Sequence, residues 1–266
     1  MGRIESTFAR LKRQKRAGLI PFITAGDPDL DTTLEIMLTM EQAGVDLIEL
    51  GIPFSDPAAD GPTIQAASQR ALAAGTSLEG VLTLVERFRA VSDVPVVLMG
   101  YYNPLFIYGM ERFAARAARA GVDGVLVVDV PFEHQEEIKV YLDPYSIRSI
   151  TLIAPTTMAE RAQQLLQQAK GFVYYVSITG VTGTTCIDID SVEQRVKELH
   201  AQSAIPIAVG FGITTSADAQ RIAKFADAVI VGSALVKVIK RYSGTAELQE
   251  QVGGFIKNLR QGLERV

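Results

Sequence analysis

The sequence has little of what several classes of protein require. A single cysteine, Cys186, among 266 residues excludes an internal disulfide framework and fits a reducing compartment. No apolar run approaches the roughly 20 residues of a membrane-spanning helix. The formal net charge of −4 argues against a nucleic acid as the main partner. We therefore expect a protein that binds neither nucleic acid nor membrane.

The N-terminal segment also lacks the apolar core and small-residue cleavage site of a secretory signal. Residues 1–6 match the short N-myristoylation pattern, and a basic cluster follows them. The alternative is a short amphipathic helix with Ile4, Phe8 and Leu11 on one face. We favour the helix, because so short a lipidation pattern often matches by accident. The expected location is the cytoplasm, or a plastid stroma if the chain is plastid-encoded.

Short apolar runs alternate with amphipathic stretches along the chain, in which 48% of the residues are hydrophobic. Most of these runs are continuous Val/Ile/Leu segments, as expected of parallel strands that are buried on both faces. The eight predicted strands are residues 19–23, 46–50, 94–99, 124–128, 149–153, 172–177, 205–209 and 228–231.

Helical patterns lie between these strands. They predict helices over residues 32–43, 78–91, 110–120, 158–168, 191–202 and 216–224. Several end on a glycine that suits a left-handed C-terminal cap, notably Gly44, Gly121 and Gly171. The tetrapeptide Ala-Gly-Val-Asp occurs at 43–46 and again at 120–123, each time between a helix and a strand.

This repetition, with no linker or low-complexity break, favours one (β/α)8 TIM barrel domain over residues 1–266, with an extra N-terminal helix. The alternative is a doubly wound open sheet, which needs a glycine-rich G-x-G-x-x-G turn after its first strand. Residues 24–28 read Thr-Ala-Gly-Asp-Pro and lack that turn. We therefore predict a barrel, whose active site lies at the carboxyl ends of the strands.

Acidic residues follow the second predicted strand, where that rule places an active site. Glu49 ends an apolar strand, and a buried carboxylate without a partner destabilises a protein unless function requires it. Asp56 and Asp60 follow on a proline-rich loop, and two acids in different environments favour acid/base catalysis. Structural alternatives remain open. Glu49 could be hydrogen-bonded to Tyr174 or Tyr175, and the two aspartates could be turn or N-cap residues.

Glycines gather in the loops after the last three strands. Gly212, Gly232 and Ser233 follow strands seven and eight, and Thr182 with Gly183 follows strand six. Glycine lets the backbone approach an anion, and the N–H groups of a helix N-terminus point at it. Barrels commonly bind phosphate in this region. We predict a phosphate site of neutral amides and a hydroxyl that needs no lysine; the alternative is that these are only tight-turn glycines.

Other chemistries find little support. His134 and His200 lie on predicted helices without a partner at metal-ligand spacing, so no metal site is expected. Cys186 has no histidine nearby, which argues against a nucleophilic role. The sequence contains no P-loop and no zinc-binding pattern.

Five motifs, at residues 21–28, 49–65, 180–183, 209–213 and 231–234, closely resemble the tryptophan synthase α subunit, in order and at family spacing. The resemblance runs from about residue 4 to about residue 260. It implies retro-aldol cleavage of indole-3-glycerol phosphate to indole and glyceraldehyde 3-phosphate, in the last steps of L-tryptophan biosynthesis. It also implies that Glu49 shuttles protons, with a pKa raised by burial, and that Asp60 accepts a hydrogen bond from the indole N–H.

The same resemblance implies the remaining roles. Pro53, Asp56 and Asp129 correspond to lid or interface positions, within mobile loops at about residues 53–60 and 179–188. This chain is expected to hold no cofactor and to form an α2β2 heterotetramer with a β subunit that carries pyridoxal phosphate. The implied substrate-binding residues are Phe22, Tyr101, Tyr174, Thr182, Gly183, Phe211, Gly212, Gly232 and Ser233.

Three other functions remain open. The chain could be an indole-3-glycerol-phosphate lyase that works without a β subunit. It could be a catalytically silent regulatory subunit that binds a phosphate ligand, which the presence of both Glu49 and Asp60 disfavours. It could also be another phosphosugar barrel, such as an epimerase or isomerase.

Overall fold

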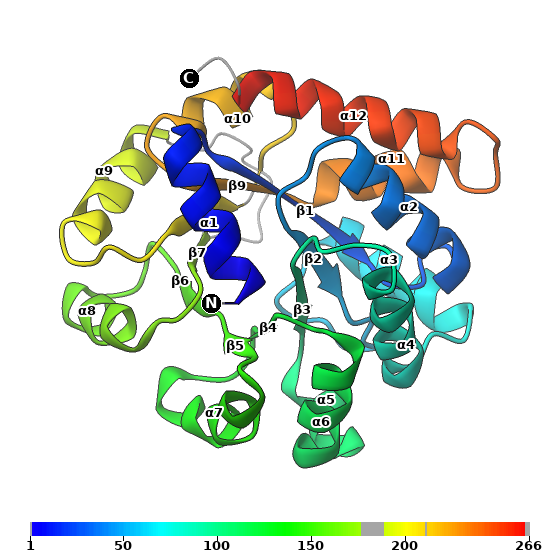
Figure 1. The fold of residues 1–266 in the computed structure, drawn as a ribbon, viewed down its shortest axis with the longest axis horizontal. Helices are drawn as coiled ribbons and strands as arrows, with labels where there is room; N and C mark the ends of the chain where they lie inside the picture. Colours follow the sequence, from blue (N-terminus) through cyan, green and yellow to red (C-terminus); the bar gives the residue numbers. More distant parts are fainter. Residues whose placement is uncertain (1, 177–188, 211, 264–266) are drawn as a thin grey trace.

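The computed structural model describes residues 2–176, 189–210 and 212–263. Within them, nine parallel strands follow the order β5-β4-β3-β2-β1-β9-β8-β7-β6, surrounded by helices (Figure 1). The strands are β1 Gly18–Thr24, β2 Ile48–Gly51, β3 Val96–Gly100, β4 Gly124–Val127, β5 Arg148–Ser149, β6 Thr151–Ile153, β7 Val173–Val176, β8 Ile207–Gly210 and β9 Ala228–Val231.

The ring closes where one predicted strand, 149–153, is divided into two. β5 pairs with β4 and β6 pairs with β7, and only Ile150 separates the two short strands. The backbone N–H of Ile150 donates to the carbonyl of Val125 at 2.9 Å, so the segment remains in the ring. The predicted (β/α)8 barrel is therefore confirmed.

All six helices predicted between the strands are confirmed, with ends shifted by at most two residues. Gly44 and Gly121 have positive φ at helix ends, as the cap prediction requires. Gly171 also has positive φ, but its helix ends at Gln168 with an extended residue, Ala169, so the prediction that Gly171 caps this helix is wrong. The helices of the described chain are α1 Arg3–Gln14, α2 Leu30–Gln42, α3 Pro62–Ala73, α4 Leu78–Arg89, α5 Tyr102–Tyr108, α6 Met110–Ala120, α7 Glu136–Leu142, α8 Ala159–Gln168, α9 Ile189–His200, α10 Ser216–Ala223, α11 Ser233–Tyr242 and α12 Leu248–Leu263. None of them is long and apolar enough to cross a membrane.

The predicted N-terminal helix covers the amino end of the barrel. Ile4, Phe8 and Leu11 of α1 are buried, and they join the side chains that fill the barrel interior. The ring of Phe8 lies 5.5 Å from that of Phe172, the residue before β7. The amphipathic pattern of this segment thus follows from packing against the barrel.

Aspartates at the amino end of the barrel form hydrogen bonds that link neighbouring strands. The backbone N–H of Asp46 donates to the carbonyl of Leu19, and its carboxylate accepts the N–H of the same residue at 3.1 Å. Asp123 repeats both bonds with Val96, and Asp227 repeats them on β8. The repeated Ala-Gly-Val-Asp tetrapeptide therefore has a structural role: it ends a helix and fixes the register of the next strand.

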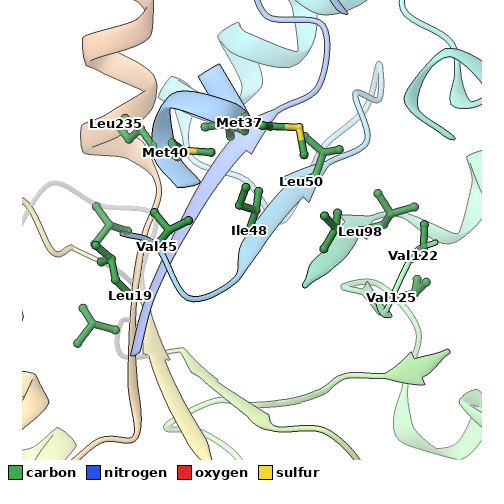
Figure 2. Packing of buried hydrophobic residues seen from close by; sticks show 14 of the residues in the cluster. Leu19, Met37, Met40, Val45, Ile48, Leu50, Leu98, Val122, Val125 and Leu235 are labelled. Atoms are coloured by element: carbon green, nitrogen blue, oxygen red, sulfur yellow. The ribbon is translucent and has the colours of Figure 1, made fainter. Parts of the chain in front are cut away.

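The alternation of side chains along β2 determines which residue faces the active site. Ile48 and Leu50 face outward, where Met37 and Met40 of α2 cover them (Figure 2). Leu47 faces the interior of the barrel. Because successive side chains of a strand point to opposite faces, Glu49 points into the barrel as Leu47 does.

Candidate active site

A cavity of about 130 Å³ opens at the carboxyl end of the barrel. It brings together side chains and backbone that are far apart in the sequence, from β1, β2, β7, the start of α11 and the loops between them. The predicted site residues that line it are Phe22, Glu49, Asp60, Tyr174, Gly212, Gly232 and Ser233. The two acids and the glycine-rich loops therefore share one site.

Glu49 is buried in this cavity, with 2% of its surface exposed. Neither of its carboxylate oxygens has a hydrogen-bond partner among the described residues. The structural alternative, a bond to Tyr174 or Tyr175, is therefore wrong. Burial, together with the negative charge of Asp60, raises the pKa of Glu49 to about 8. Near neutral pH this carboxyl group holds a proton that it can donate.

Asp60 has a different environment. Its carboxylate accepts a hydrogen bond from the Tyr101 hydroxyl at 3.0 Å, and that hydroxyl accepts the backbone N–H of Ala59 at 3.0 Å. Burial raises the pKa of Asp60, while the bond from Tyr101 acts in the opposite direction and favours the ionised form. The N-cap residue of α3 is Gly61, so the alternative that Asp60 caps this helix is wrong.

Tyr101 contacts Asp60 but does not line this cavity. It is 5% exposed, and its ring lies 5.3 Å from that of Phe54 on the loop after β2. The sequence predicted a substrate-binding residue here, whereas the structure gives Tyr101 contacts with Asp60 and its loop. A role in holding Asp60 follows directly from these contacts.

Two strand-end glycines make room for the aromatic side chains of the site. A Cβ atom on Gly51 would lie 2.6 Å from the ring of Phe22, and one on Gly210 would lie 2.5 Å from the hydroxyl oxygen of Tyr174. Any larger residue at either position would displace these rings. Sequence reasoning did not identify Gly51 as a determinant of the site, although it lies two residues after Glu49 at the end of β2.

The part of the cavity lined by the start of α11 has the features predicted for phosphate binding. Gly212 has a φ of 73°, and Gly232 precedes the first turn of α11, which begins at Ser233. That first turn has no acidic residue and no capping side chain, so its N–H groups remain available to an anion. The predicted Thr182, Gly183 and Phe211, and the predicted lid at 179–188, lie outside the described residues.

The cavity is also lined by residues that the sequence analysis did not identify. Ile64, Met99, Ile213 and Ile230 supply apolar surface between the acids and the glycine-rich loops. Lys237 of α11 also lines it, although the sequence suggested a site without lysine. Helical spacing could have identified Lys237 from the sequence, because it lies four residues after Ser233 and therefore on the same face of the helix.

The three predicted lid or interface residues differ in solvent exposure. Asp56 and Asp129 are exposed, and Asp129 accepts the backbone N–H of Tyr102 at 2.9 Å. Pro53 is buried and does not belong to the exposed rim.

The two histidines lie away from the cavity. His134 contacts Glu137, and His200 contacts Asp227. No group of three metal-binding side chains occurs in the part of the chain that the structure describes.

Comparison with known proteins agrees with this geometry. A family model described as tryptophan synthase alpha chain matches residues 8–264. The chain belongs to the tryptophan synthase alpha chain family. Family membership makes it a lyase of tryptophan biosynthesis, as the motifs of its sequence predicted.

Individual relatives support the same assignment. The tryptophan synthase alpha chain of Citrifermentans bemidjiense is 52% identical over 263 residues, which cover 99% of this chain and 98% of that protein. The protein of Geotalea uraniireducens is 50% identical over 266 residues, covering 100% and 99% respectively. The crystal structure of the subunit from Legionella pneumophila has a TM-score of 0.92 at 38% identity and covers all of both chains.

Proposed function

We propose that this chain cleaves indole-3-glycerol phosphate to indole and glyceraldehyde 3-phosphate by a retro-aldol reaction. The observation that carries the proposal is the state of Glu49, a fully buried carboxyl group without a hydrogen-bond partner in the described chain and with a pKa raised to about 8. Such a group destabilises the fold, which is understandable if catalysis needs a proton donor there.

Two proton transfers by Glu49 account for the reaction. Protonated Glu49 donates its proton to carbon 3 of the indole ring, and the positive charge that develops reaches the ring nitrogen. The ionised Glu49 then takes the proton of the hydroxyl on the side-chain carbon bonded to carbon 3. That oxygen becomes the aldehyde oxygen as the carbon–carbon bond breaks. The electron pair of the bond returns to the ring, which leaves as indole, and Glu49 regains its proton.

Asp60 has the complementary role in this mechanism. Its carboxylate accepts a hydrogen bond from the indole N–H and stabilises the positive charge of the protonated ring. The bond from Tyr101 supports this role, because it favours ionised Asp60 and fixes the position of the carboxylate. The indole lies among Phe22, Ile64 and Met99, and the phosphate lies at the start of α11.

We also propose that a tryptophan synthase β subunit, which holds pyridoxal phosphate, docks on the carboxyl side of the barrel in an α2β2 assembly. Phe106 and Ile107 of α5 are 62% and 76% exposed, although large apolar side chains are usually buried. Phe106 lies beside Tyr102, whose backbone binds Asp129 on the rim of the active site. Exposed apolar side chains close to a site are typical of a partner surface.

Indole release by the purified chain tests the proposal. The chain is mixed with indole-3-glycerol phosphate, with and without a β subunit. We expect indole and glyceraldehyde 3-phosphate in equal amounts, released faster when the β subunit is present. Strong activity that a β subunit leaves unchanged indicates a stand-alone lyase. The absence of indole under both conditions contradicts the proposed reaction.

A further inference from the structure

Lys237 is the only lysine or arginine among the described residues that line the active-site cavity. Its side chain is exposed, and no hydrogen bond or ion pair within the described chain engages its ammonium group. Lys170 and Lys197 pair with carboxylates, whereas Lys237, which lines the cavity, has no such partner within the described chain. The group remains available to an anionic ligand.

The geometry of α11 directs this side chain toward the start of the helix. Residues 233 and 237 are four apart and therefore share one helix face. Side chains of a helix lean toward its N-terminus, so the lysine covers the turn that contains Ser233. The cavity lining agrees, because Gly232, Ser233, Ala234 and Lys237 all contribute to it.

The first turn of α11 contains neither an acidic residue nor a capping side chain. Asp218 and Thr215 form a capping box at α10, and Asp29 accepts the N–H of Thr32 at α2. At α11 the N-cap residue is Gly232, and no side chain caps the turn. An independent observation also indicates a ligand in this cavity, namely the buried carboxyl group of Glu49 without a hydrogen-bond partner among the described residues.

The balance of charges between a bound phosphate and the cavity indicates a function for Lys237. A phosphate monoester brings nearly two negative charges into a cavity that already holds Asp60. The N-terminus of a helix offers the equivalent of only about half a positive charge. We propose that Lys237 is a positioning residue that forms an ion pair with the substrate phosphate and supplements the backbone N–H groups of α11. This inference rests on the proposed function, because it assumes a phosphorylated substrate.

The ammonium group and the acids have separate roles in this proposal. The pKa of Glu49 is raised by burial and by Asp60, with no contribution from Lys237. Loss of the lysine should therefore weaken substrate binding without altering proton transfer. This separates the proposed ion pair from a general effect on the active site.

The variant K237M tests the inference, with K240M as its matched control. Lys240 lies on the same helix and is exposed, but it does not line the cavity. We expect K237M to raise the KM for indole-3-glycerol phosphate about tenfold, with kcat and the pH profile of kcat within about twofold of the parent. K237R should retain most of the affinity. Thermal unfolding of each variant confirms that the fold is intact.

Binding of inorganic phosphate, measured by calorimetry, distinguishes failure of this inference from failure of the proposed function. If K237M weakens phosphate binding and the parent cleaves no substrate, the ion pair stands and the proposed reaction fails. If the parent cleaves substrate but K237M has the KM and phosphate affinity of K240M, the ion pair is contradicted. Equal loss of activity by K237M toward a substrate analogue without phosphate contradicts it as well.

Discussion

The Tyr101 hydroxyl donates a hydrogen bond to the Asp60 carboxylate at 3.0 Å, and burial together with the charge of Asp60 raises the pKa of Glu49. One acid of the site therefore has a hydrogen bond that favours its ionised form, while the other has none and is buried. Burial raises the pKa of both carboxyl groups, but only Asp60 has a hydrogen bond that opposes the rise. This difference is the basis of the mechanism proposed above.

Replacement of Glu49 by Gln should abolish most of the lyase activity. The amide has nearly the same size as the carboxyl group but cannot donate and recover a proton. We expect kcat for indole release to fall about 10²- to 10⁴-fold, the usual contribution of general acid–base catalysis. E111Q serves as the control, because Glu111 is an exposed residue of α6. Equal activity of E49Q and the parent would contradict the proton-transfer role.

The same substitution should change how stability depends on pH. The pKa of Glu49 is raised from 4.5 to about 8 in the folded chain. Protonated Glu49 therefore stabilises the folded state fully below pH 4.5, and this stabilisation is lost as the pH rises toward 8. We expect the free energy of unfolding of E49Q, relative to the parent, to increase by a few kcal/mol across this range. Urea unfolding at several pH values measures it, and a constant difference would contradict the raised pKa.

Removal of the Tyr101 hydroxyl should impair Asp60. In Y101F the carboxylate loses a charge-assisted hydrogen bond, so the pKa of Asp60 should rise further and its ionised form become less populated. We expect kcat/KM for indole release to fall about 10- to 100-fold, consistent with such bonds. Y102F is the matched control, since Tyr102 contacts Asp129 through its backbone N–H. A similar loss in both variants would argue against a specific role of the Tyr101 hydroxyl.

The partner surface can be tested without measuring catalysis. Serine at both Phe106 and Ile107 removes the exposed apolar side chains of α5. We expect the Kd for a β subunit to rise at least about tenfold, because buried aromatic and aliphatic anchors dominate most interfaces. V91S is the control, as Val91 is 70% exposed but lies after α4, at the amino end of the barrel. Unchanged affinity of the α5 double variant would place the partner elsewhere.

The regular part of the fold could be predicted from the sequence because each element carries its own local pattern. Continuous apolar runs marked the strands, and glycines such as Gly121 marked helix ends. The division of one strand at Ile150 could not be predicted, since it arises from pairing with two different neighbours. Helix α3 is not among the six predicted helices, because its buried face consists largely of small residues such as Ala67 and Ala71.

Residues of the site could likewise be predicted only where the signal lies within one segment of the sequence. Glu49 was identifiable because an acid at the end of an apolar strand breaks a local pattern. Lys237 was not identified, since an exposed lysine on a helix has the ordinary pattern of a solvated face. The fit of Phe22 over Gly51 depends on the register of β1 against β2, which no single segment encodes.

A titration of the Glu49 carboxyl group tests the central claim most directly. The side-chain carboxyl carbons of the chain are labelled with ¹³C, and the resonance that disappears in E49Q identifies Glu49. The account predicts a pKa of about 8 for this group in the free protein. A pKa near the ordinary value of 4.5 would contradict it, because Glu49 would then hold no proton to donate near neutral pH.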